Sequence, residues 1–212
     1  MVSTTIHLLR HGEVHNPTGV LYGRLPGYGL SQLGRDMAAQ VASAVASRDI
    51  TAVIASPLQR AQETAAPIAA ALGLPIGSDP RLLEAENKFE GLRVGVGDGA
   101  LRNPRYWPLL RNPFRPSWGE PYRQQADRVL AAVDSARAQV RGHEALLVSH
   151  QLPIWVARLA ISDHRLWHDP RHRECTLASL TSLQFEGDRL VAIHYTEPAA
   201  DLLPGASAVA GA

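Results

Sequence analysis

The stretch LLRHGEVHNP at positions 8–17 decides how this chain is interpreted, because it closes the first predicted strand. The run TTIHLLR at positions 4–10 is short, β-branched and apolar, which is typical of a buried strand. That strand ends on Arg10, His11 and Gly12, two basic side chains followed by the residue with the smallest side chain. A buried strand has no structural use for such a triplet. The sequence therefore predicts a site at the carboxyl end of this strand.

Strand and helix patterns alternate along the rest of the chain. Helices are predicted over 32–48, 57–73, 121–140 and 152–161, and strands over 51–56, 74–79, 145–150, 176–185 and 189–195. Ser31 and Ser56 are suitable N-caps, Pro57 suits a first helical position, and Gly73 suits a helix end. This alternation predicts a single α/β domain with a mostly parallel sheet and helices on both of its faces.

The composition excludes several classes of protein. Lys and Arg number 21 against 20 Asp and Glu, a net charge of +1, which argues against nucleic-acid binding through phosphate neutralisation. The sequence has no run of about 18 apolar residues and no signal-peptide pattern, so neither a membrane span nor secretion is expected. The single cysteine, Cys175, suits a reducing compartment. We therefore expect a cytoplasmic protein that uses neither nucleic acid nor membrane as a partner.

Basic side chains follow three of the predicted strands. Arg10 and His11 follow the first strand, Arg60 lies in the helix after the second, and His150 ends the strand at 145–150. In a sheet of this kind, binding sites lie at the carboxyl ends of the strands. Two guanidinium groups, two imidazoles and a helix N-terminus would then converge, and that combination suits a phosphate dianion.

The same residues belong to a longer ordered pattern. Its pieces are RHG at 10–12, GRLPGYGLSQLGR at 23–35, SPLQRAQETA at 56–65, RLLEAENKFEG at 81–91 and VSH at 148–150. In this order, over roughly residues 4–160, the pattern resembles the histidine phosphatase superfamily, also called phosphoglycerate mutase-like. The resemblance implies a three-layer α/β/α sandwich that hydrolyses phosphomonoesters through a phosphohistidine.

The resemblance also implies a role for individual residues. His11 matches the nucleophile, and Arg10, Arg60 and His150 match the pocket that binds the phosphate. Asn16 resembles the asparagine that follows the family's first motif and is expected to bind substrate. The chemistry agrees, because a neutral imidazole can attack phosphorus in line while fixed cations stabilise the equatorial oxygens. No metal and no cofactor is required.

The leaving alkoxide needs a proton, so the site also needs a carboxylic acid. Glu84 matches the family's proton donor, and Glu86, two positions later, remains an alternative. Gln151 follows His150 where the family commonly has glycine, which alters either the backbone path or one polar contact.

Residues 92–123 are irregular and rich in Gly, Pro, Trp and Arg. We interpret them as a cap insertion over the active site within a domain at 1–198, followed by a flexible C-terminal tail at 199–212. Two interpretations of the cap's arginines remain: a solvated basic surface, or recognition of a second negative group on the substrate. Its aromatic residues, Trp107, Phe114 and Trp118, serve either packing or substrate contact.

Three histidines at four-residue spacing, His164, His168 and His172, suggest zinc, but Pro170 interrupts any helix there and no other ligand motif accompanies them. Solvated loop histidines are favoured. The sequence as a whole predicts a phosphatase for a small phosphorylated metabolite. The alternatives are a phosphoglycerate mutase and a phosphate-binding module without turnover. The oligomeric state stays open, a homodimer included.

Overall fold

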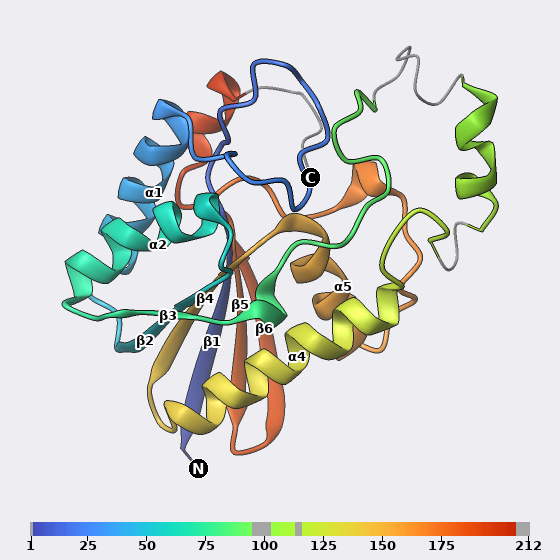
Figure 1. Ribbon diagram of the computed structural model, residues 1–212. Coiled ribbons are helices and arrows are strands. Elements are labelled where there is room, and N and C mark those ends of the chain that lie inside the picture. The colour runs from blue at the N-terminus through green and yellow to red at the C-terminus, as the bar shows by residue number, and fades with distance from the viewer. Residues whose placement is uncertain (1, 95–102, 113–115, 207–212) are drawn as a thin grey trace.

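The computed structural model describes residues 2–94, 103–112 and 116–206. Its central feature is a six-stranded sheet with the strand order β3-β2-β4-β1-β5-β6 (Figure 1). The strands are Ser3–Arg10 (β1), Ile50–Ala55 (β2), Ile76–Ser78 (β3), Glu144–Ser149 (β4), Leu180–Glu186 (β5) and Arg189–Thr196 (β6). The first four are parallel, whereas β5 and β6 form an antiparallel hairpin beside β1. The predicted α/β class and mostly parallel sheet are confirmed.

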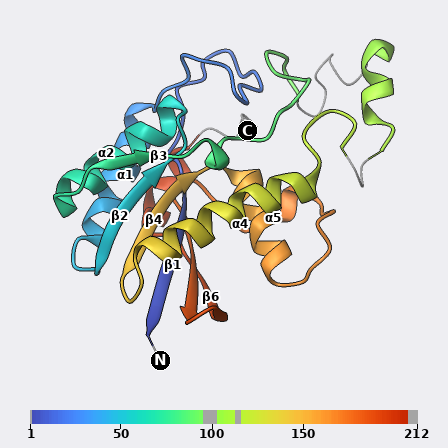
Figure 2. The ribbon, with the colours of Figure 1, turned by 60° about the horizontal axis from the view of Figure 1, so that its bottom comes forward.

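Helices cover both faces of this sheet (Figure 2). The α-helices are Gln32–Val45 (α1), Gln59–Leu72 (α2), Tyr122–Gln139 (α4) and Gln151–Ile161 (α5), and short 3₁₀ helices span Pro80–Leu82, Pro104–Leu110, Pro170–His172 and Ala200–Gly205. Leu9 of β1 packs with α1 and α2, while its neighbour Leu8 packs with α4 and α5. Alternation along β1 therefore fills two cores, one on each face, and gives three layers. None of the helices in these described ranges is long and apolar enough to span a membrane.

The helix ends follow the sequence signals with one exception. Ser31 caps α1 through its side chain, and Gly73 ends α2 in the left-handed region at φ 66°, as predicted. However, α2 begins at Gln59 and has Leu58 at its N-cap position, so the predicted start at Pro57 is wrong. The hydroxyl of Ser56 accepts a long hydrogen bond from the N–H of Leu58 at 3.4 Å and makes its shorter contact, 2.9 Å, with His150.

Strand β5 begins at Leu180, four positions later than expected. The intervening chain turns instead of extending, because Ala178 has a left-handed φ of 55° and donates its N–H to the carbonyl of His11 at 3.3 Å. This loop therefore supports the end of β1.

Part of the segment expected to be a flexible tail packs on the core. Ala199 is buried, and Leu202 and Leu203 lie against the hydrophobic cluster beneath α1. Asp201 accepts a hydrogen bond from Gln40 of α1 at 2.7 Å. Residues 199–206, whose leucines find an apolar surface, thus pack against the core, and residues 207–212 lie outside the described ranges.

The end of β1 meets the start of α1 backbone to backbone. A Cβ atom at Gly12 would lie 2.5 Å from the carbonyl oxygen of Gly34, and one at Gly34 would overlap the carbonyl oxygen of Glu13. Both positions therefore require glycine. This contact fixes where the strand ends and where His11 is presented.

Candidate active site

His11 lies at the carboxyl end of β1 and is fully buried. Its Nδ1 is 2.7 Å from the carbonyl oxygen of Gly12, so in the neutral ring Nδ1 carries the proton and donates it. Nε2 then holds the lone pair and accepts a hydrogen bond from Nε of Arg60 at 3.3 Å. Burial, and after it the charges of Arg60 and Arg10, hold the pKa of His11 well below its ordinary value. The ring is therefore neutral, held in one orientation, and has an unprotonated Nε2.

Two arginines flank this ring without a carboxylate partner. Arg60 is 1% exposed, donates through Nη2 to the carbonyl of Gly23 at 2.7 Å and lies 4.7 Å from the centre of the Tyr22 ring. Arg10 donates through Nη1 to the carbonyl of Cys175 at 2.8 Å, and its buried Nε has no partner. Within the described ranges neither forms an ion pair. A buried and a partly buried cation without ion-pair partners favour an anionic ligand.

His150 is the second buried imidazole, and its ring centre lies 5.1 Å from that of His11. Its Nε2 is 2.9 Å from the hydroxyl of Ser56, and its buried Nδ1 has no partner. Burial, then Arg60 and His11, hold the pKa of His150 well below its ordinary value. Sequence reasoning assigned Ser56 only to a helix cap and missed this contact. Its place at the end of β2, beside β4, was the available signal.

Glu84 brings a carboxyl group to the same place. It is 3% exposed, its Oε1 accepts from the N–H of Ala85 at 2.8 Å, and its buried Oε2 has no partner. Burial raises the pKa of Glu84, while the N–H of Ala85 and the nearby arginines oppose that rise. Glu86, by contrast, pairs with Arg24 at 2.9 Å and has a side chain 69% exposed. Of the two candidates, Glu84 is the one that the structure places beside Arg10 and Arg60.

Asn16 is not joined to this group by any hydrogen bond of the described residues. Its Nδ2 donates to the carbonyl of Val20 at 2.9 Å, and its Oδ1 accepts from the N–H of Val20 and the hydroxyl of Thr18. The side-chain amide of Asn16 therefore stabilises the loop at 16–20. The structure brings together five of the six predicted site residues, His11, His150, Arg10, Arg60 and Glu84, and leaves Asn16 in that loop.

Sequence reasoning also missed a residue on the far side of the site, Arg173. Burial is the largest influence on the pKa of Arg173 and lowers it. The nearby charge of Glu84 raises this pKa, and that of Arg10 lowers it. Nη1 of Arg173 donates to Oε1 of Gln151 at 3.3 Å, and Nε2 of Gln151 donates to the carbonyl of Cys175 at 3.2 Å. Arg10 shares that carbonyl. Gln151, where the family commonly has glycine, thus adds polar contacts at the edge of the site.

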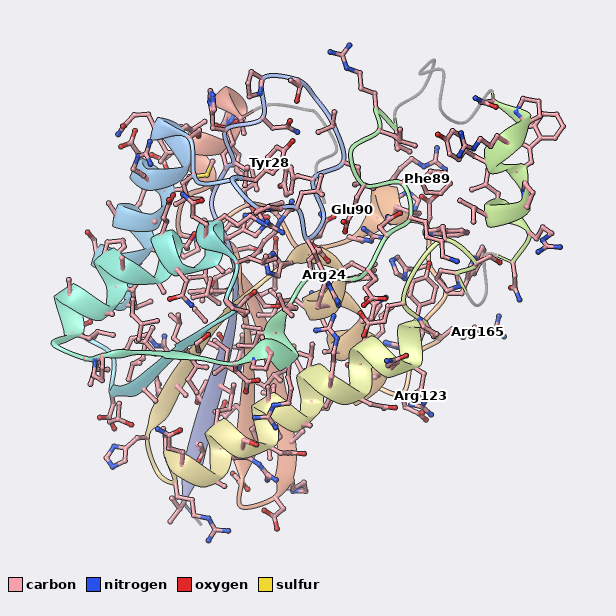
Figure 3. The ribbon with its side chains drawn as sticks, in the orientation of Figure 1. Arg24, Tyr28, Phe89, Glu90, Arg123 and Arg165 are labelled. Carbon is pink, nitrogen blue, oxygen red and sulfur yellow. The ribbon has the colours of Figure 1, made fainter. Side chains whose placement is uncertain are left out.

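A cavity of about 400 Å³ opens beside Glu84. Its walls are mainly apolar, with one arginine and three glutamates among the described lining residues, which include Leu21, Phe89, Leu110, Trp118, Tyr122 and Leu152. Figure 3 shows Phe89 and Arg24 between the sheet and the 3₁₀ helix at 104–110. The space adjoins the carboxyl group of Glu84.

The described arginines of the segment 92–123 lie on the outer surface. Arg93, Arg105, Arg111 and Arg123 are all exposed, and Figure 3 shows Arg123 on the outside of the molecule. Of the aromatic residues, Trp118 lines the cavity and Trp107 is 58% exposed. Arg102, Phe114 and Arg115 lie outside the described ranges. The structure therefore favours the solvated interpretation for the arginines that it describes.

Comparison with known proteins agrees with this geometry. The family model of the histidine phosphatase superfamily (branch 1) matches residues 6–198. The chain is 64% identical over 197 residues to the uncharacterized protein Rv0525 of Mycobacterium tuberculosis, covering 93% of this chain and 98% of that protein.

Two further relatives carry names that point to phosphate chemistry. The probable phosphoglycerate mutase GpmB of Shigella boydii is 33% identical over 175 residues, covering 72% of this chain and 78% of that protein. The mycobacterial glucosyl-3-phosphoglycerate phosphatase Rv2419c superposes with a TM-score of 0.73, covering 92% of this chain and 96% of its own at 24% identity. At that identity the likeness concerns the fold.

Proposed function

The chain belongs to the histidine phosphatase superfamily (branch 1), and we propose that it hydrolyses a small phosphorylated metabolite through a phosphohistidine formed on His11. One observation carries the proposal. The lone pair on Nε2 of His11 faces Arg60 in a site where Arg10 and Arg60 form no ion pair with any described residue and Glu84 has an unpartnered oxygen. Nucleophile, anion pocket and acid are thus assembled in one place.

The first step forms the phosphoenzyme. The substrate's phosphoryl group takes the place between Arg10, Arg60 and His150, and one of its oxygens accepts the Nε hydrogen bond that Arg60 now gives to His11. Nε2 attacks phosphorus as the ester P–O bond breaks, and protonated Glu84 gives its proton to the leaving oxygen. The carbonyl of Gly12, which accepts from Nδ1, stabilises the positive charge that develops on the ring.

The second step returns the enzyme to its starting state. Ionised Glu84 takes a proton from water, whose oxygen attacks phosphorus as the P–Nε2 bond breaks. Inorganic phosphate leaves, His11 is again neutral, and Glu84 is again protonated. The arginines stabilise the charge on the transferring phosphoryl group in both steps.

A phosphoglycerate mutase is the second candidate, favoured by the name of the GpmB relative. A mutase must keep water away from its phosphohistidine and return the phosphoryl group to product. The stretch EAENKFEGLRVG at 84–95 lacks the longer insertions around the acid that such mutases share. We therefore place hydrolysis first.

Phosphate release from a panel of monoesters, with and without 2,3-bisphosphoglycerate, separates the two functions. Hydrolysis without the bisphosphate, together with acid-quenched labelled phosphate on His11, is the expected result. Turnover only in its presence, with transfer instead of release, would favour the mutase. Specific phosphate binding without any turnover would mean a binding module.

Two features complete the proposal. Residues 92–123 act as a cap over the active site, supported by the lining of the cavity beside Glu84 by Leu110 and Trp118. The cytoplasm is the proposed location, supported by the one cysteine, which is buried.

A further inference from the structure

Arg173 is a partly buried cation in the wall of the cavity beside Glu84. It precedes the loop at 174–179 and is the one basic side chain among the described lining residues. Neither the attack by His11 nor the proton transfer by Glu84 uses it. Its place in the cavity wall therefore calls for a function of its own.

The hydrogen-bond partners of Arg173 are neutral. Nε donates to Nε2 of His168 at 2.8 Å, and Nη1 donates to Oε1 of Gln151 at 3.3 Å. Nδ1 of His168 is 2.7 Å from the carbonyl of Leu166, so Nδ1 carries the ring's proton and Nε2 accepts. Burial lowers the pKa of His168 and keeps the ring in this neutral form. The charge on the guanidinium group is thus held in place without being balanced.

The other arginines beside the cavity differ in this respect. Arg24 and Arg128 both pair with Glu120, at 3.2 and 2.7 Å, and Arg24 also pairs with Glu86. Two of the three glutamates in the cavity wall are therefore neutralised within the protein. In the part of the chain that is described, Arg173 has no carboxylate within 4.0 Å, and its Nη2 has no hydrogen-bond partner. The third glutamate, Glu84, has a pKa raised by burial, which favours its neutral form. An incoming anion would then meet a cation that has no ion-pair partner among the described residues.

The rest of the cavity wall determines what would carry that anion. Phe89, Trp118, Tyr122 and Leu152 offer apolar surface between the acid and the cap segment. A cavity of about 400 Å³ with this lining has room for an apolar ligand portion at least as large as one aromatic ring.

We propose that Arg173 binds a carboxylate on the alcohol portion of the substrate, so that the preferred substrates are phosphomonoesters with an apolar body and a second, carboxylate anion. The inference rests on the proposed phosphatase function for the phosphate end of the ligand. Gln151 and His168 are positioning residues, because they fix the guanidinium fork that a carboxylate can engage with two hydrogen bonds.

Affinity, measured without turnover, tests the proposal. The probes are 3- and 4-carboxybenzylphosphonate and the matching carbamoylbenzylphosphonates, in which a methylene group replaces the ester oxygen and an uncharged amide replaces the carboxylate. Calorimetric titration of the whole protein should show the better carboxylate probe binding about 10- to 100-fold more tightly than its carbamoyl partner. Arg173→Gln should remove this preference, and Arg173→Lys should keep part of it.

Arg171→Gln is the matched control, since Arg171 lies in the same loop, is 85% exposed and pairs with Asp169. It should leave the preference of the carboxylate over the carbamoyl probe unchanged. Equal binding of the two probes to the natural chain would overturn the proposal. An equal loss of affinity for both probes in Arg173→Gln would also overturn it, because Arg173 would then contact the phosphate. Tight phosphonate binding without ester hydrolysis would instead count against the proposed function and leave the carboxylate test intact.

Discussion

Arg60 donates from Nε to the unprotonated Nε2 of His11 across 3.3 Å, so this buried guanidinium group occupies the lone pair that attacks phosphorus in the proposed mechanism. A bound phosphate oxygen competes for the same donor. In the proposed mechanism, binding of the anion therefore frees Nε2 of His11. Without ligand, the charge of Arg60 helps to keep the pKa of His11 low, after burial as the larger cause.

Replacing the nucleophile should abolish turnover. His11→Ala is expected to lower kcat/KM by at least about a thousandfold and to eliminate labelled phosphoenzyme, because no other imidazole takes the in-line position. Circular dichroism and Tm should report a retained fold, although the ring is fully buried and its loss leaves a small cavity. Activity within about tenfold of the natural chain would assign the nucleophile elsewhere.

Arg60→Met should separate stability from activity. The guanidinium is 1% exposed with no carboxylate partner, so an apolar side chain of similar length should hold Tm steady or raise it in phosphate-free buffer. Catalysis should fall by about 10²- to 10³-fold, as when a preorganised donor is removed. Inorganic phosphate should raise the Tm of the natural chain and not that of the variant. A large loss of Tm in phosphate-free buffer would show that Arg60 serves the fold.

The two acidic candidates differ in how they should respond to the leaving group. Glu84→Gln should slow hydrolysis of alkyl phosphates far more than that of p-nitrophenyl phosphate, whose leaving group needs no proton. Glu86→Gln is the control, because its exposed carboxylate pairs with Arg24, and it should show no such dependence. The opposite pattern in presteady-state kinetics would transfer the acid role to Glu86.

Acid should destabilise the fold through its buried histidines. His7, bonded to Ser182 and Glu144, has a pKa lowered by burial, as do His11 and His150, whose ordinary value is 6.5. The unfolded chain therefore binds more protons as pH falls below 6.5, and stability is intact above that pH and lost below it. Each histidine should contribute about 1.4 kcal/mol per pH unit until its folded-state pKa is reached. Glu84, whose pKa is raised, acts in the opposite direction.

Urea unfolding between pH 7.5 and about pH 5.5 measures this slope. A double variant, His11→Asn with His150→Asn, should show a shallower dependence than the natural chain. An unchanged slope would mean that these rings are not buried in the neutral form.

The strand ends explain why so much of the site could be predicted. Once β1, β2 and β4 are recognised as neighbouring parallel strands, Arg10, His11 and His150 must meet at one edge of the sheet. The periodicity of the apolar residues predicts the strands, and the resemblance carried by the ordered motifs indicates which residues at their ends belong together. The fold class and five of the six site positions follow from it together with the ordered motifs.

What the sequence did not reveal depends on contacts through space. Ser56 satisfies the rule for a helix cap, yet it contacts His150 because β2 and β4 are adjacent. Gln151 and Arg173 belong to no local pattern and meet only after α5 and its following loop have packed. Asn16 matched a motif position, but its loop closes on Val20. Secondary-structure propensity reflects residues that are close in sequence. The partners of Ser56, Gln151 and Arg173 are set instead by how distant segments pack together.

The contact between Gly12 and Gly34 has a consequence for how mutations in this protein will be interpreted. Gly34 lies in α1, has no contact with the phosphate pocket and would pass for an ordinary helical glycine. Any side chain there pushes on the backbone of Glu13 and, through it, on the peptide that orients His11. A substitution of Gly34 would therefore lower activity although every residue of the proposed site is unchanged. A genetic screen would assign this defect to α1 and not to the site that it disturbs.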